Sequence, residues 1–194
     1  MDTARYVVAI LMLVGVAYAI PYWFIVHPFV SFWRRLGLRI AYSILTVVTL
    51  ILAVVTYLLK DRILTVEYGT NLPLIVLAVI CYGAAITIQI QVAKHLKFRI
   101  LAGIPELESS GKGGKLLQEG IYSRIRHPRY MSFMFGVVAI ALFTNYLAMY
   151  VLVLLSAAAL YFVVLLEEKE LRNRFGDDYV RYSRRVPRFI PQMR

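Results

Sequence analysis

The sequence is poor in cysteine and in charge. Cys81 is the one cysteine among 194 residues, so no intramolecular disulfide can form and no cysteine-based zinc framework is available. Charged residues make up 17% of the chain, whereas soluble domains contain about a quarter. Hydrophobic residues make up 60%, and the mean hydropathy is +0.69. This composition excludes an ordinary soluble domain and indicates a protein whose solvent is a lipid bilayer.

Motifs of several common enzyme classes are also missing. No GxGxxG sequence follows a predicted strand, which excludes a Rossmann-type nucleotide site. No GxSxG sequence is present, so the nucleophile elbow of serine hydrolases is absent. His27, His95 and His127 have no helical metal-ligand spacing, and we expect no zinc site.

Uncharged stretches of membrane length predict transmembrane helices. A hydrocarbon core of ~30 Å requires about 20 helical residues. Residues 6–26, 40–59 and 72–93 meet this requirement. The first stretch belongs to a longer uncharged run, so we expect it to stay in the membrane and not to be removed as a signal peptide.

The uncharged run 130–166 is too long for one span. Its 37 residues would form a helix of about 55 Å. We predict a break near Thr144 and Asn145, which gives two further spans at 130–144 and 146–166 in a tight hairpin. The expected fold is an all-α integral membrane protein with five transmembrane helices in a single domain, residues 1–194.

The distribution of charge supports this topology. With the N-terminus outside and the C-terminus cytosolic, the outer loops carry three basic and three acidic residues, and the whole net charge of +11 lies inside. The positive-inside rule expects this bias. Orientation and anionic headgroups then explain the basic charge, and no nucleic acid partner is needed. We expect the plasma membrane if the source is prokaryotic and the endoplasmic reticulum if it is eukaryotic.

Two polar segments, 94–129 and 167–194, form the predicted cytosolic cap. The second continues the last span as a helix that Gly176 stops. A short helix over 177–185 follows, and residues 186–191 are expected to be extended and to fold back onto the membrane face.

Polar side chains gather at 120–130, directly before the fourth span. Pro128 suits the first position of a helix, which makes His127 its N-cap. The helix start and the flanking arginines favour a carboxylate or phosphate here and bias His127 toward its neutral form. Tyr130, three positions later, shares a helix face with His127. The alternative interpretation is an interfacial belt of aromatic and basic residues at headgroup depth.

Two glutamates end the fifth span. Glu168 has Arg172 at i+4, which predicts a surface ion pair. Glu167 has Leu171 at that position. A carboxylate without a predicted cationic partner at the hydrocarbon edge is costly and is therefore a site candidate. The alternative is that Glu167 only extends toward the headgroups.

These residues resemble the isoprenylcysteine carboxyl methyltransferase family. The first shared motif is Gly120-x-Tyr122-x-x-x-Arg126-His127-Pro128-x-Tyr130. The second is Glu167-Glu168 followed by Phe175-Gly176-x-x-Tyr179-x-x-Tyr182-x-x-x-Val186-Pro187. The resemblance covers about residues 94–191, and five spans are typical of short prokaryotic members.

The resemblance implies a membrane methyltransferase that binds S-adenosylmethionine through non-Rossmann elements and releases S-adenosylhomocysteine. The implied acceptor is the carboxylate of a prenylated cysteine or a similar lipid, which enters between helices. The implied catalytic residues are Arg126, His127 and Glu167, with no metal. The implied cofactor-binding residues are His95, Gly114, Lys115, Leu116, Leu117, Tyr122, His127, Pro128, Arg129, Tyr130, Glu167 and Glu168.

The sequence departs from the family at two places. Eukaryotic members carry an arginine about one turn before the acidic pair, and residues 161–166 contain no cation. The family's Asn-His-x-x-Gln stretch appears at 94–98 with its histidine, His95, but without its glutamine.

Other functions share part of the pattern. A lipid amine N-methyltransferase has much of the motif, but an amine acceptor needs a proton acceptor, for which His127 is the candidate. A membrane sterol reductase has a similar tail and binds NADPH. A non-enzymatic scaffold with an interfacial helix would not explain why both motifs occur together.

Overall fold

The structure is a computed structural model, and it describes residues 3–26, 30–94 and 116–190. Within these ranges the chain is helical, and its only β-type pairing is an isolated bridge between Glu67 and Tyr146. The helices are α1 (Thr3–Val26), α2 (Val30–Leu36), α3 (Leu38–Ile63), α4 (Leu72–Ala93), the 3-10 helix η1 (Gly120–Ser123), α7 (Pro128–Thr144), α8 (Leu147–Phe175) and α9 (Asp177–Arg185).

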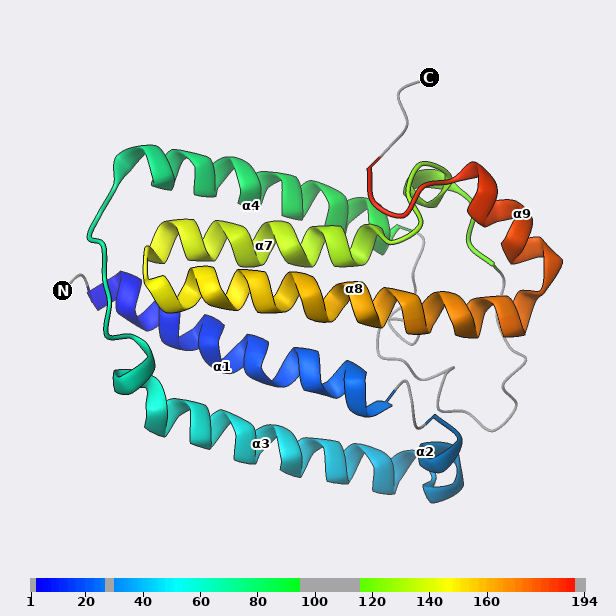
Figure 1. Cartoon of the computed structure of the whole chain (residues 1–194), viewed down its shortest axis with the longest axis horizontal. Coiled ribbons are helices and arrows are strands. Elements are labelled where there is room, and N and C mark those ends of the chain that lie inside the picture. Colours follow the sequence, from blue (N-terminus) through cyan, green and yellow to red (C-terminus); the bar gives the residue numbers. More distant parts are fainter. Residues whose placement is uncertain (1–2, 27–29, 95–115, 191–194) are drawn as a thin grey trace.

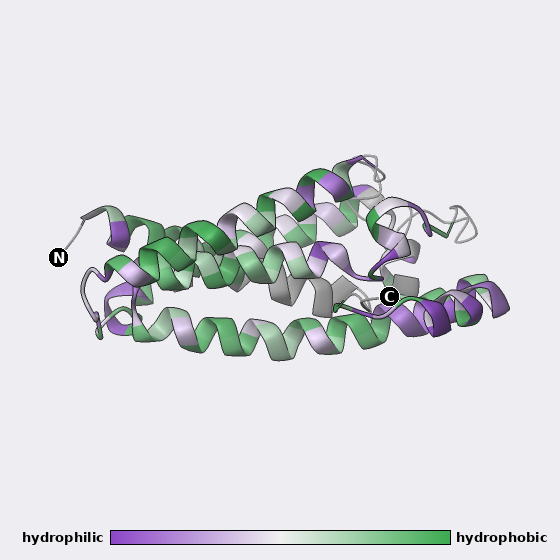
Figure 2. Cartoon of the chain, turned by 90° about the horizontal axis from the view of Figure 1, so that it is seen from above, coloured by the Kyte–Doolittle hydropathy of each residue, from purple (hydrophilic) through white to green (hydrophobic). Residues whose placement is uncertain are grey.

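The long helices run side by side along one axis and appear from top to bottom in Figure 1 as α4, α7, α8, α1 and α3. Helix α1 packs against both α7 and α8. Hydrophobic residues occupy the middle of the bundle, and hydrophilic residues gather toward its ends (Figure 2). Among the described residues, three helical stretches are long and apolar enough to cross a membrane: Arg39–Ile63, Leu72–Ala93 and Leu147–Phe175. Shorter apolar stretches are Thr3–Val16 and Pro128–Thr144. The chain is an all-α integral membrane protein.

The helix boundaries follow local signals in the sequence. The predicted stretch 72–93 coincides with α4, where Asn71 caps the first turn by accepting a hydrogen bond from the Leu74 N–H. Helices α1 and α3 extend beyond the predicted 6–26 and 40–59. Helix α2 was not predicted, because its first four residues end the uncharged run 6–33 and two arginines follow them directly.

The uncharged run 130–166 is interrupted where the sequence predicts it. Helix α7 ends at Thr144 and α8 begins at Leu147. Asn145 between them has φ 56° and ψ 43°, the left-handed conformation that asparagine tolerates better than most residues. Its amide donates to the Gly69 carbonyl at 2.9 Å and accepts from the Tyr150 hydroxyl at 2.7 Å. These bonds tie the turn to the connection between α3 and α4.

A buried arginine fastens the same end of the bundle. Arg5 of α1 is 2% exposed. Its guanidinium donates to the Thr144 carbonyl at 2.7 and 3.1 Å, to the Thr70 hydroxyl at 3.0 Å, and pairs with Glu67 at 3.1 Å. The start of α1, the end of α7 and the α3–α4 connection therefore meet at one charged centre.

The opposite end carries the predicted polar cluster. Pro128 is the first residue of α7 and His127 is its N-cap, as predicted, although the His127 side chain makes no capping hydrogen bond. Helix α8 continues past Leu166 to Phe175, where Gly176 with φ +54° ends it, and α9 follows. The start of α7, the end of α8 and α9 consequently lie together at this end (Figure 1).

Candidate functional site

Glu168 is the centre of the ionic cluster at this end. It is 2% exposed. Its carboxylate lies 3.1 Å from Arg126 Nη2 and 3.2 Å from His127 Nε2, and Arg188 holds both of its oxygens, at 3.1 and 2.9 Å. The predicted surface ion pair with Arg172 is therefore wrong, because Glu168 points into the protein, where cations from two distant segments reach it.

The imidazole of His127 lies between the two glutamates. Its Nδ1 is 3.5 Å from Glu167 Oε2, and its Nε2 is 3.2 Å from Glu168 Oε1. Burial by itself lowers the pKa of His127, but the two carboxylates stabilise the imidazolium more strongly and raise the pKa above its ordinary value. The predicted bias toward the neutral form is wrong, because that prediction took account only of the neighbouring arginines and the helix start.

Glu167 differs from Glu168 in its accessibility. Its side chain is 27% exposed, whereas that of Glu168 is 3% exposed. The carboxylate of Glu168 is already occupied by Arg126, His127 and Arg188. Of the two glutamates, Glu167 is therefore the more accessible to a ligand.

Residues 186–190 lie across the start of α7, and we call them the strap. The Arg126 N–H donates to the Pro187 carbonyl at 2.9 Å, and the His127 N–H donates to the Arg188 carbonyl at 3.1 Å. The Phe189 ring lies 6.0 Å from the His127 ring, and the Tyr130 ring lies 5.8 Å from it. The predicted shared face of His127 and Tyr130 is thus confirmed, and the strap covers it.

Other predicted site residues lie in hydrophobic clusters beside the ionic cluster. Tyr122 packs with Val92 and Leu117, and its carbonyl accepts a 2.7 Å hydrogen bond from the Tyr182 hydroxyl. Leu116 packs against Tyr182 and the rest of α9. These contacts join the polypeptide before α7 to α9.

The remaining predicted residues divide into two groups. Pro128 is buried and Arg129 is half-buried at the first turn of α7. His95, Gly114 and Lys115 lie outside the described residues.

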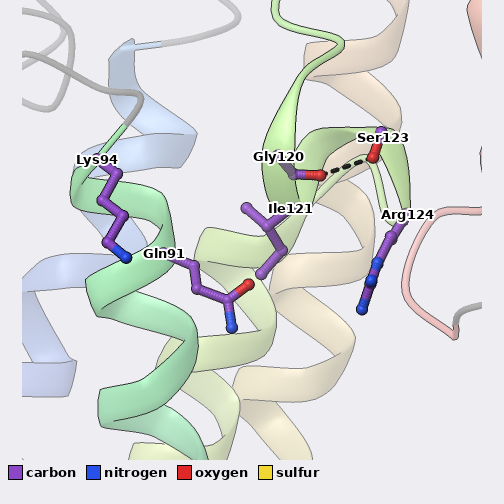
Figure 3. Close-up of a pocket in the computed structure, with 6 residues that line it drawn as sticks. All are labelled: Gln91, Lys94, Gly120, Ile121, Ser123 and Arg124. Carbon is purple, nitrogen blue, oxygen red and sulfur yellow. Dashed lines mark hydrogen bonds between the residues drawn. The ribbon is translucent and has the colours of Figure 1, made fainter.

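A polar cleft lies beside η1. Its volume is about 540 Å³, within the range of about 300–1,000 Å³ that small-molecule sites occupy. Figure 3 shows the Gln91 side chain extending from α4 toward Ile121. The full lining is Gln91, Lys94, Gly120, Ile121, Ser123 and Arg124. The sequence analysis missed this cleft, because its only signal was a pair of basic residues on segments far apart in the chain.

The phospholipid methyltransferase family model matches residues 73–178, which is more than half of the chain and includes both glutamates and the start of α7. The chain belongs to the phospholipid methyltransferase family. This family is of the isoprenylcysteine carboxyl methyltransferase type, so the family predicted from the two motifs is confirmed. Its members are membrane methyltransferases, and the match covers the start of α7 and the end of α8 but not the segment that carries Arg188.

Two curated proteins are similar to part of this family member. One is the nickel-cobalt-cadmium resistance protein NccN of Alcaligenes xylosoxydans xylosoxydans, 31% identical over 85 residues, which are 44% of this chain and 40% of that protein. The other is the cobalt-zinc-cadmium resistance protein CzcN of Cupriavidus metallidurans, 31% identical over 85 residues, 44% of this chain and 39% of that protein. The chain thus spans about 40% of the length of these relatives. No solved structure matches it.

Both relatives are named for resistance to metal ions. Among the described residues, no group of three or more histidine, cysteine, aspartate or glutamate side chains is arranged to hold a metal ion.

Proposed function

We propose that this protein is an S-adenosylmethionine-dependent membrane methyltransferase that acts on the carboxylate of a prenylated cysteine or a similar lipidic acceptor. The observation that carries the proposal is the His127 ring between Glu167 and Glu168. It joins the two sequence motifs in one cluster, at the end of apolar helices where a polar cofactor and a lipid can meet. Membership of the phospholipid methyltransferase family supports it.

The residues present fit the proposed cofactor. S-adenosylmethionine carries a sulfonium and an ammonium group, and it supplies an electrophilic methyl group. Glu167 offers an accessible carboxylate for a positive group. The loop 120–127 borders the polar cleft at Arg124 and the ionic cluster at Arg126, so one loop can hold the rest of the cofactor. His95, Gly114, Lys115, Leu116, Leu117, Tyr122, Pro128, Arg129 and Tyr130 remain proposed cofactor residues.

The charge state of His127 favours a carboxylate acceptor. A carboxylate is already ionised near neutral pH and needs no general base, whereas an amine must lose a proton. The raised pKa of His127 keeps a larger share of its rings protonated at a given pH, and a protonated ring cannot accept a further proton. We therefore propose that His127 orients Glu167 and supplies positive charge. Arg126, whose side chain is 9% exposed, is proposed to hold Glu168 in position.

We also propose the five-span topology. Helices α1, α3, α4, α7 and α8 would cross the membrane as one domain, with the N-terminus outside and the ionic cluster at the cytosolic face. Helix α7 has 17 residues, about 25 Å at 1.5 Å per residue, so the bilayer would have to thin slightly around it. The net charge of +11 supports this orientation.

Two assays on the purified protein in nanodiscs test the proposal. In calorimetry we expect micromolar binding of S-adenosylhomocysteine and no binding of NADPH; the reverse result would support a sterol-reductase-like protein. In a labelled-methyl assay, prenylcysteine, fatty acid and aminolipid acceptors are compared in parallel. We expect base-labile methyl ester on the carboxylate acceptors. Label on the aminolipid alone would establish the N-methyltransferase alternative, which the name of the phospholipid methyltransferase family favours.

A further inference from the structure

Arg188 lies on the accessible side of the ionic cluster. Its side chain is 34% exposed, whereas the other cations on Glu168, Arg126 and His127, are 9% and 3% exposed. Arg188 is therefore the cation of this cluster that an incoming molecule meets first.

The surface next to Arg188 is apolar. Tyr161, Phe162 and Leu165 of α8 are 47%, 58% and 38% uncovered by protein, near the end of the uncharged part of that helix. Tyr161 is near enough to Arg188 to interact with its charge. A lipid tail lying along this side of α8 would bring its head to Arg188.

The guanidinium of Arg188 is held in place and has further donors. Its Nε and Nη2 bind the two oxygens of Glu168, at 3.1 and 2.9 Å. A guanidinium carries five N–H donors, so this ion pair leaves others for a second oxyanion. Because Arg126 and His127 also contact Glu168, the cluster does not depend on Arg188 alone for its positive charge.

We propose that Arg188 binds the anionic oxygen group of the lipidic acceptor, a carboxylate or a phosphate, and thereby determines which lipids are methylated. That the bound lipid accepts a methyl group rests on the proposed methyltransferase function. The binding of an anionic lipid by Arg188 does not depend on it. The strap is then a specificity element as well as a cover for His127.

Direct binding separates these two claims. Labelled N-acetyl-S-farnesylcysteine and its methyl ester differ by one methyl group, which removes the carboxylate charge. Each would be titrated into the protein in nanodiscs without cofactor, for the wild type, Arg188→Gln, Arg188→Lys and Arg184→Gln. Arg184 is the matched control, since it is an exposed arginine on α9 near the strap.

We expect Arg188→Gln to weaken binding of the acid at least tenfold and of the ester less than twofold. Arg188→Lys should retain part of the affinity for the acid, and Arg184→Gln should behave as the wild type. Equal losses for acid and ester would show that Arg188 only supports the structure. Unchanged affinities for both the acid and a phospholipid would overturn the proposal. Arg188→Lys keeps a positive charge near Glu168. If Arg188→Gln does not fold, the same comparison of acid and ester affinities is therefore made with Arg188→Lys.

A phospholipid arm distinguishes the source of the oxyanion. Phosphatidylethanolamine carries a phosphate, and loss of its binding in Arg188→Gln with unchanged acid binding would assign the phosphate. In calorimetry, the affinity of the same variants for S-adenosylhomocysteine should differ from that of the wild type by less than twofold. If the wild type binds the acid through Arg188 but does not bind S-adenosylhomocysteine, the methyltransferase proposal is refuted and the anion site is retained. If it binds S-adenosylhomocysteine but does not bind the acid through Arg188, the anion site is refuted and the methyltransferase proposal is retained.

Discussion

Glu167 and Glu168 are adjacent in the sequence, yet they contact opposite nitrogens of the His127 ring, and only Glu167 is accessible from outside. Neighbours on a helix differ in direction by about 100°, so one carboxylate points into the protein and the other along its edge. The pair thus divides into a buried carboxylate and a partly exposed one.

Glu168→Gln is expected to destabilise the fold. Removing one partner of a buried ion pair costs about 3–5 kcal/mol, because the remaining charges stay buried, and Glu168 serves three cations. Thermal unfolding in mild detergent should show a clear fall in midpoint. Glu170→Gln, two positions further along α8, is the control and should unfold close to the wild type. Similar midpoints for both variants would contradict the central role of Glu168.

Glu167→Gln is expected to weaken cofactor binding without such a loss of stability. Its side chain is partly exposed, and its contact with His127 is long at 3.5 Å. Calorimetry should give an affinity for S-adenosylhomocysteine roughly tenfold lower, which corresponds to about 1.4 kcal/mol. Glu170→Gln should leave the affinity unchanged. If the two variants bind equally well, Glu167 does not contact the cofactor.

The charge of His127 predicts a loss of stability at alkaline pH. The pKa of His127 is raised in the folded state by Glu167 and Glu168. A raised pKa stabilises the fold fully below the unfolded value of about 6.5, and this contribution disappears as the pH rises through the folded value. The unfolding midpoint of the wild type should therefore fall as the pH rises above about 6.5 and through the raised pKa of the folded state.

The His127→Gln variant isolates this effect. Glutamine does not titrate, so its midpoint should change less than that of the wild type over the same interval. Parallel curves for the two proteins would show that His127 does not carry the predicted charge.

The far end of the bundle offers a test of stability alone. Arg5→Met removes the cation that joins Thr144, Thr70 and Glu67 and should cost about 3 kcal/mol. Arg62→Met changes an exposed arginine near the same end and should be almost neutral. Methyl transfer by the surviving folded protein should be unchanged in both, because the ionic cluster is at the other end. A selective loss of activity in Arg5→Met would connect the two ends.

The left-handed turn at Asn145 can be tested by a pair of substitutions. Asn145→Gly and Asn145→Ala both lose the side-chain bonds to Gly69 and Tyr150. For alanine, the left-handed backbone conformation in addition costs about 1–2 kcal/mol. Asn145→Ala should therefore unfold at a lower temperature than Asn145→Gly. Equal midpoints would indicate that the turn relaxes.

The parts of the fold that were predictable depend on neighbouring residues. Pro128 at a helix start, Gly176 at a helix end and a break at Asn145 all follow from local backbone preferences, and each is where the sequence places it. The family could also be predicted, because the motif spacing survives in the sequence itself.

The partners of Glu168 could not be predicted in this way. His127 and Arg188 are 41 and 20 positions from it, and only the packing of α7, α8 and the strap brings them together. A prediction from neighbouring residues alone paired Glu168 with the nearer Arg172. It also assigned His127 the wrong charge, because it took no account of the distant glutamates. The cleft at Lys94 and Arg124 also requires two distant segments to meet.

The hydrogen bonds from Arg126 and His127 to the strap have a consequence for biosynthesis. A ribosome makes the start of α7 some 60 residues before it makes Arg188. The apolar helices before Glu168 can begin to enter the bilayer during that interval, before Arg188 exists to pair with Glu168. The cluster closes only after Pro187 and Arg188 have emerged, so membrane insertion precedes completion of the site, and a nascent chain halted before the strap would be inserted but unfinished.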